Sequence, residues 1–149
     1  MDGLHTFFIS GMLAACMILI TCLIHYEFMG LVTRVLPRLR GRARRVNVLL
    51  VVGGMFVAHT VEIWAWAVAY VLVLKMKWGA LLGQVGAQDF WELLYYSTVS
   101  YTSLGLGEIY PQGALRLLTG AEALAGLIMI TWTASLTYLI MERDWGFRK

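Results

Sequence analysis

Three long apolar segments constrain the fold of this chain more than any other feature. They run approximately over His5–His25, Val46–Leu74 and Ala114–Met141. Each is long enough to cross a bilayer as a helix, which takes about 20 residues. Of the 149 residues, 60% are hydrophobic and 14% are charged, a balance that soluble domains of this size rarely reach. We therefore expect an all-α membrane protein with three transmembrane helices.

Between the second and third segments lies a stretch in which glycine alternates with leucine. It reads Ser103-Leu104-Gly105-Leu106-Gly107, follows a run of hydroxyl side chains and precedes Glu108. Glycine at alternate positions lets a backbone adopt conformations that other residues resist, so successive carbonyl oxygens can face one axis. Rings of such oxygens replace the water shell of a cation, and non-helical backbone at membrane depth is tolerated where it lines a cavity. The stretch predicts a cation-selective pore.

The run Phe90–Tyr101, just before this stretch, is apolar and aromatic but too short to cross a bilayer alone. A short helix that dips into the membrane fits it, with Asp89 as its capping residue and Glu92 three positions later. The carbonyl end of that helix would favour a cation below it. The expected units are a first transmembrane helix over 1–30, a basic loop over 31–45 and a pore domain over 46–149. Within the pore domain we expect an outer helix at 46–75, a pore helix at 89–102, a filter at 103–108 and an inner helix at 114–141.

The filter stretch resembles the potassium-channel signature Thr-Val-Gly-Tyr-Gly-Asp. The likeness extends over roughly Val57 to Trp145 and is to the small bacterial pore-loop potassium channel family. It implies a homotetramer with four filters around one axis, K⁺ as the permeant ion, passive transport and no cofactor. Further motifs that carry it are His59-x-x-Glu62, Tyr95-Tyr96-Ser97, and Arg116 followed by Glu122 and Gly126. Alignment with the family's inner helix implies that the inner pore and its hinge are formed by Gly126, Ile130, Thr131, Ala134 and Tyr138.

Three filter positions depart from the family pattern in their polar side chains. Ser103 replaces threonine but keeps a hydroxyl, and Glu108 replaces aspartate at the expected outer mouth. Leu106 replaces tyrosine, which removes a ring hydroxyl that could brace the strand, although the ion would still be held by backbone oxygens. Potassium selectivity is therefore the leading expectation. The alternatives are a weakly selective or non-selective cation channel, or a non-conducting accessory subunit.

Four side chains are expected to support the filter. Tyr95 or Tyr96 could donate a hydrogen bond to Glu108. Helical spacing turns Glu122 toward the pore helix, where Ser97 and Thr98 offer hydroxyls. A lone carboxylate at that depth would be costly, so we expect it to be hydrogen-bonded. The predicted support group is Tyr95, Tyr96, Thr98 and Glu122.

His59 and Glu62 lie three residues apart inside the second segment and so share a helix face. They raise a remote alternative, an intramembrane metal-dependent enzyme. Such sites need three or four ligands, and we expect His25 to lie near the opposite membrane edge, at the end of the first span. A structural polar pair is therefore favoured, with no metal beyond the permeant cation, and the chain is not expected to be an enzyme.

Basic residues predict the orientation of the chain. Six of its 12 Lys and Arg residues lie between Leu31 and Arg45, and three more follow the last span, against Lys75, Lys77 and Arg116 at the other end. Short Arg-rich loops stay in the cytoplasm. We therefore expect a multi-pass protein with its N-terminus outside and its C-terminus in the cytoplasm. The resemblance implies that the membrane is a bacterial inner membrane, and no nucleic-acid partner is expected. Anionic lipid headgroups are a candidate partner of Arg40, Arg42, Arg44 and Arg45.

Overall fold

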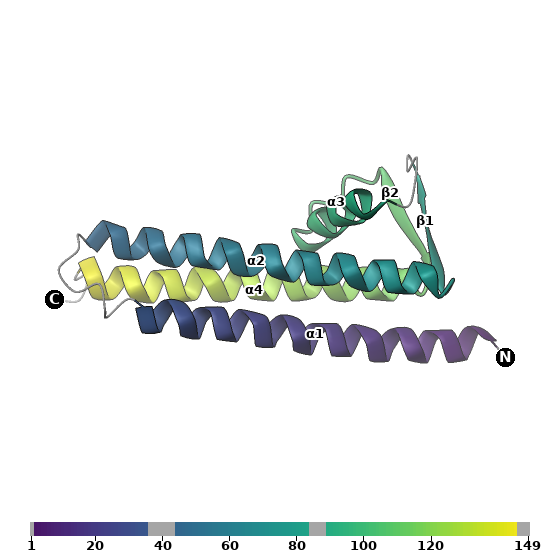
Figure 1. Cartoon of the computed structure of the whole chain (residues 1–149), viewed down its shortest axis with the longest axis horizontal. Coiled ribbons are helices and arrows are strands. Elements are labelled where there is room, and N and C mark those ends of the chain that lie inside the picture. The colour runs from purple at the N-terminus through teal and green to yellow at the C-terminus, as the bar shows by residue number, and fades with distance from the viewer. Residues whose placement is uncertain (1, 36–43, 84–88, 146–149) are drawn as a thin grey trace.

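The structure is a computed structural model that describes residues 2–35, 44–83 and 89–145. Three long helices lie side by side in it: α1 (Asp2–Val35), α2 (Arg44–Lys75) and α4 (Leu115–Trp145) (Figure 1). Each holds a stretch long and apolar enough to cross a membrane, namely His5–Val35, Arg45–Lys75 and Leu115–Arg143. The three expected spans are therefore present, and the chain is a multi-pass membrane protein.

Helix α1 is longer than expected, and this corrects the position of His25. The first span was predicted to end at His25–Glu27, within a unit of residues 1–30, but the helix continues to Val35. The residues after Glu27 remain mostly apolar, and the first helix breaker in the sequence is Pro37. His25 therefore lies inside the helix, where its side chain is fully buried.

A short helix, α3 (Phe90–Tyr101), packs against α2 and α4 near the end of the bundle that holds the N-terminus (Figure 1). Asp89 occupies its N-cap position with extended backbone, but the Asp89 side chain makes no capping hydrogen bond, contrary to expectation. The last described turn of α4, ending at Trp145, lies at the opposite end of the bundle. The N-terminus and the filter stretch are thus at the same end.

The fold is not purely helical, because two short strands pair outside the bundle. Strand β1 (Gly79–Gly83) runs antiparallel to β2 (Ile109–Gly113), with Gly79 opposite Gly113 and Gly83 opposite Ile109. Sequence reasoning treated the first of these segments as a linker. Glycine is required at residue 83, where φ is +125° and an added Cβ would lie 1.9 Å from the Glu108 carbonyl oxygen. The sheet therefore fixes the chain on both sides of α3.

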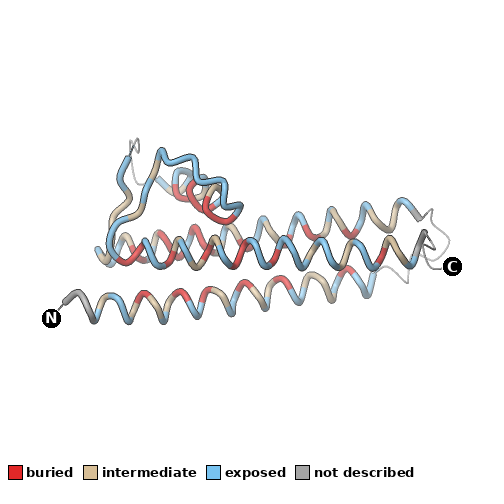
Figure 2. Tube along the Cα trace, turned by 180° about the vertical axis from the view of Figure 1, so that it is seen from behind, coloured by how far each residue is buried: buried red, intermediate tan, exposed pale blue. Residues whose placement is uncertain are grey.

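The core follows the facing sides of the helices, and the outward faces are exposed in the single chain (Figure 2). One buried cluster joins all four helices around Trp66, Tyr70 and Leu118, and a second joins α1, α2 and α4 around Met55. The exposed faces carry large apolar side chains such as Phe56. Apolar surface of this extent suits contact with lipid or with further copies of the chain.

Candidate functional site

The backbone of the filter stretch alternates in handedness. Residues Ser103, Gly105 and Gly107 have positive φ angles of 57°, 55° and 79°, whereas Leu104 and Leu106 between them do not. A backbone that alternates in this way can carry successive carbonyl oxygens on one side of the chain. The region with positive φ is open to glycine and costly for a residue such as serine. All five residues, together with the following glutamate, are exposed in the single chain.

The filter stretch begins directly at the carbonyl end of α3. Backbone hydrogen bonds from Ser103 to Ser100 and from Leu104 to Val99 close the last turn of the helix. The negative end of the α3 dipole therefore lies beside the first filter residues. This arrangement places helix carbonyls and filter carbonyls next to one another.

Gly126 lies where the last residue of α3 comes close to α4. A Cβ built on it would be 2.0 Å from the carbonyl oxygen of Tyr101, the last residue of α3. Helix α4 continues through this position. The glycine thus serves a close contact with the pore helix. The other residues expected to form the inner pore are exposed on α4, namely Ile130, Thr131, Ala134 and Tyr138.

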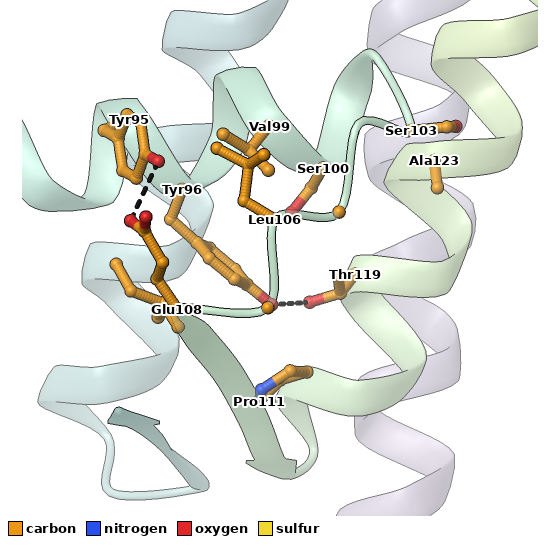
Figure 3. Close-up of a pocket in the computed structure, with 13 residues that line it drawn as sticks. Tyr95, Tyr96, Val99, Ser100, Ser103, Leu106, Glu108, Pro111, Thr119 and Ala123 are labelled. Atoms are coloured by element: carbon orange, nitrogen blue, oxygen red, sulfur yellow. Dashed lines mark hydrogen bonds between the residues drawn. The ribbon is translucent and has the colours of Figure 1, made fainter. Parts of the chain in front are cut away.

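Two tyrosines of α3 reach the flanks of the filter stretch (Figure 3). Tyr95 donates a hydrogen bond to Glu108 at 3.2 Å, which is one of the two contacts considered from the sequence. Tyr96 instead pairs with the Thr119 hydroxyl of α4 at 2.7 Å. Beside them a pocket of about 350 Å³ is lined by Leu106 and both tyrosines, among others.

Glu122 is fully buried between α2, α3 and α4. Its carboxylate accepts hydrogen bonds from Ser97 at 2.5 Å and from Tyr70. Thr98 does not take part: it is exposed and donates to the Leu94 carbonyl of its own helix. Neighbouring residues of a helix point about 100° apart, so Ser97 and Thr98 cannot both face one carboxylate. Sequence reasoning did not identify Tyr70.

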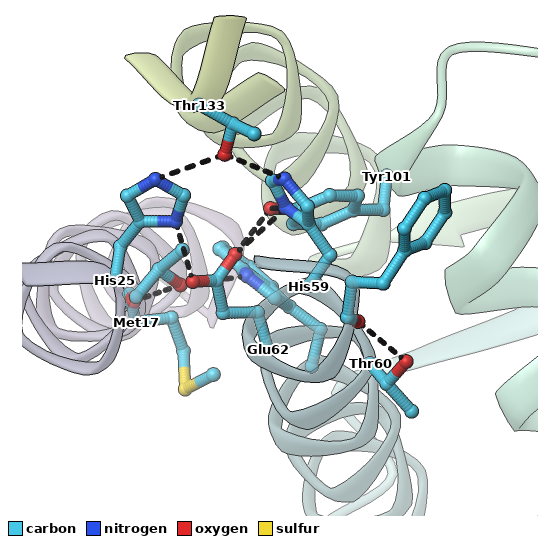
Figure 4. A network of polar contacts seen from close by, with 10 residues as sticks. Met17, His25, His59, Thr60, Glu62, Tyr101 and Thr133 are labelled. Atoms are coloured by element: carbon cyan, nitrogen blue, oxygen red, sulfur yellow. Dashed lines mark hydrogen bonds and ion pairs between the residues drawn. The ribbon is translucent and has the colours of Figure 1, made fainter. Parts of the chain in front are cut away.

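A second buried polar group surrounds Glu62 (Figure 4). His25 contacts one oxygen of this carboxylate at 2.9 Å, and Tyr101 donates to the other. His59 contacts the Tyr101 hydroxyl at 2.9 Å and Thr133 at 3.0 Å. The expectation that His25 lies far from His59 and Glu62 is wrong, because α1 extends beyond it.

Atoms of His25, His59 and Glu62 lie within 4.8 Å of one another, a spacing that a metal site also requires. Here the same atoms are occupied by hydrogen bonds to each other and to the Tyr101 and Thr133 hydroxyls. Sequence reasoning missed Tyr101 and Thr133 as members of this group. Their signal was a polar side chain within or beside an apolar span, which is costly without a partner.

The basic residues are described only in part. Arg40 and Arg42 lie outside the described residues. Arg44 is the first residue of α2, and Arg45 is exposed.

Comparison with known proteins identifies the family to which the chain belongs. No curated protein and no solved structure matches the chain. The family model described as an ion channel matches residues 48–143, which include most of α2, the filter stretch and most of α4. Since this is a family of ion channels, the expectation that the chain is not an enzyme is confirmed. From the matched residues and the site within them, the chain belongs to the ion channel family.

Proposed function

We propose that the chain forms a homotetrameric cation channel that passes potassium in preference to sodium. The observation that carries this proposal is the alternating backbone from Ser103 to Gly107. One such strand cannot enclose an ion, whereas four around an axis can replace its water shell with carbonyl oxygens. Closed cyclic symmetry is the usual way to arrange identical chains.

The charges around the filter favour cations over anions. The carbonyl end of α3 carries about half a negative charge, which acts on the entrance to the filter from the cavity side. At the opposite end Glu108 is exposed, and its carboxylate is oriented by Tyr95. Four copies of Glu108 would form an acidic ring at the outer mouth, as rings of acidic side chains do in cation channels.

Selectivity requires the filter to keep its dimensions, and we propose that the buried contacts of α3 hold it in place. Glu122 ties Ser97 of α3 to Tyr70 of α2, and Tyr96 ties α3 to Thr119 of α4. These contacts compensate in part for Leu106, which lacks a hydroxyl. Glu122 would therefore act as a positioning residue behind the filter.

The exposed face of α4 supplies the rest of the pore in this proposal. Ile130, Thr131, Ala134 and Tyr138 would line the inner cavity of the tetramer. Nine basic residues lie in the sequence between Leu31 and Arg45 or after the last span, and such short Arg-rich segments favour the cytoplasmic side, here of a bacterial inner membrane. The N-terminus and the filter would then face outside.

The test combines the assembly state with ion flux. Native mass measurement of the purified protein should give four chains, and reconstituted vesicles should take up potassium. Gly105→Ala should assemble but lose the flux, because a Cβ penalises the φ of 55° at that position. Gly53→Ala is the matched control, since nothing lies within 4 Å of its added Cβ. Finding only monomers or dimers, or full flux through Gly105→Ala, would overturn the proposal.

A further inference from the structure

A closed ring of hydrogen bonds joins the four helices (Figure 4). Glu62 contacts His25 at 2.9 Å, and the other nitrogen of that imidazole contacts the Thr133 hydroxyl at 3.3 Å. Thr133 contacts His59 at 3.0 Å, and the second nitrogen of His59 contacts the Tyr101 hydroxyl at 2.9 Å. Tyr101 closes the ring by donating to the remaining oxygen of Glu62. We refer to these residues as the five-residue ring.

The ring has one contact more than it has protons when its histidines are neutral. Each of the five contacts around the ring needs one proton between its two heavy atoms. The longer approach of His59 Nδ1 to Glu62 Oε2, 3.4 Å, crosses the ring and can only share the proton of the His59–Tyr101 contact. Two neutral imidazoles and two hydroxyls supply one proton each, and an ionised carboxylate supplies none. Four protons then serve five contacts, so two lone pairs face each other somewhere in the ring. The ring also carries one uncompensated negative charge at buried side chains, which is costly.

One additional proton corrects both defects. With it, His25 donates to Glu62 and to Thr133, Thr133 donates to His59, His59 donates to Tyr101, and Tyr101 donates to Glu62. Every contact then has its proton, and the net charge of the ring is zero. Reversing the Thr133 hydroxyl moves the positive charge to His59 without breaking a contact. A second additional proton would place two protons on one contact.

We propose that the five-residue ring is a buried binding site for one proton, which fastens α1 to the last residue of the pore helix. His25 is the ring's member from α1, which lies outside the residues matched by the family. Tyr101 is the last residue of α3, two positions before the filter stretch. Binding of the proton at this site therefore stabilises both the docking of α1 against the other helices and the position of the residues next to the filter.

Titratable groups face the ring from each of the helices packed around it. From α1 the ring is faced by His25, from α2 by His59 and Glu62, and from α3 by Tyr101. From α4 the carboxylate of Glu122 acts on Tyr101 electrostatically. Glu122 itself is hydrogen-bonded outside the ring, by Ser97 and Tyr70. Among the described residues, Glu122 is thus the group whose titration must be separated from that of the ring. The ring indole of Trp132 stacks on His25 without adding a charge.

The proton count determines how folding stability depends on pH. In the unfolded chain histidine titrates near pH ~6.5 and glutamate near pH ~4.3, so above about pH 7.5 the unfolded chain lacks the additional proton. The folded chain then binds one proton more than the unfolded chain. Stability must fall as the pH rises, and the ratio of folded to unfolded protein must fall about tenfold per pH unit until the ring itself loses the proton.

Glu62→Gln provides a matched variant, because the amide brings its own proton to the ring. Gln at position 62 can donate to His25, and the donations continue through Thr133, His59 and Tyr101 back to its own carbonyl oxygen. Five contacts then have five protons with both imidazoles neutral and no net charge. Glu62→Gln should therefore fold with α1 docked and lack the additional proton. Glu122 is present in both proteins, so its titration cancels in the comparison.

The experiment measures reversible unfolding of the purified full chain in detergent between about pH 7.5 and pH 8.5. Relative to Glu62→Gln, the folded-to-unfolded ratio of the wild type should fall about tenfold over this interval. Parallel curves for the two proteins would overturn the proposal. Because the readout needs no ion flux, it is independent of whether the chain conducts.

Two further measurements cover the remaining outcomes. The first uses wild-type protein alone at about pH 8 and combines nitrogen NMR of labelled histidine with infrared spectroscopy of the carboxyl groups. These spectra should find the additional proton on an imidazole or on Glu62. Two neutral imidazoles beside an ionised Glu62 would overturn the proposal, even if Glu62→Gln does not fold. The samples are measured with and without a chelator, and a bound metal ion whose removal abolishes the pH dependence would also overturn it.

Discussion

Substitution of Gly126 by alanine tests the contact between the pore helix and the inner helix. The added Cβ would lie 2.0 Å from the Tyr101 carbonyl oxygen and 2.9 Å from its carbon, whereas ordinary contacts begin at about 3.4 Å. The obstructing atom belongs to the backbone and cannot rotate away, so the upper range of overpacking costs, about 3 kcal/mol, applies. The higher helix propensity of alanine offsets about 1 kcal/mol. We expect a net loss of about 2 kcal/mol, or about 30-fold in the folding equilibrium.

The assay is reversible unfolding in detergent, with flux of the reconstituted variant as a second readout. Gly120→Ala is the matched control, because Gly120 lies in the same helix and nothing lies within 4 Å of its added Cβ. The control should be unchanged or stabilised by up to about 1 kcal/mol. If Gly126→Ala is as stable and as conductive as the control, then α3 and α4 do not approach one another as described.

Four further predictions concern the buried network, the membrane topology and the basic loop. Glu122→Gln should assemble and conduct with less pH dependence than the wild type, as flux at several pH values would show. Glu122→Leu should lower the stability of the assembled protein by about 1–3 kcal/mol, because the buried Tyr70 hydroxyl loses its carboxylate partner and keeps only a 3.4 Å contact with Thr119, whereas Ser97 keeps its bond to the Ile63 carbonyl. A variant with unchanged stability and selectivity would remove the proposed bracing role. Labelling of cysteines placed at Lys75 and Arg45 should show the two positions on opposite sides of the membrane, and finding both on one side would contradict the three-span arrangement. Binding to vesicles of anionic lipid should weaken when the four arginines of the basic loop are neutralised together, namely Arg40, Arg42, Arg44 and Arg45. Unchanged binding with altered topology would mean that these residues only set the orientation of the chain.

The membrane spans and the filter stretch could be predicted because their signals are local. Continuous apolar character marks α1, α2 and α4, and alternating glycine marks the positive φ angles at Gly105 and Gly107. The positive φ at Ser103 extends the same alternation to a residue whose side chain gives no such signal.

The sheet could not be predicted, because neither strand carries a strong local signal. Strand β1 reads Gly-Ala-Leu-Leu-Gly, and glycine and alanine are depleted in strands. Strand β2 contains Pro111, which is tolerated here because a two-stranded sheet has only edges. The pairing depends on α3 bringing the two segments together, which is a tertiary effect.

The ring around Glu62 was missed for a different reason. His59 and Glu62 were recognised as a pair, but their partners come from three other helices and have no fixed spacing in sequence. The decisive error was the end of α1, since ending that helix near His25 removed the histidine from the bundle interior. Polar residues in apolar spans, such as Thr133, point to such groups only once the depth of each helix is known.

The central claim is that four copies of the filter stretch hold a partly dehydrated cation and prefer potassium. The most direct measurement is the reversal potential of the purified, reconstituted protein with potassium on one side of the bilayer and sodium on the other. A filter that prefers potassium should displace the reversal potential in the direction that marks potassium as the more permeant ion. A reversal potential of zero would contradict potassium selectivity while leaving a cation pore, and the absence of any current would contradict the pore itself.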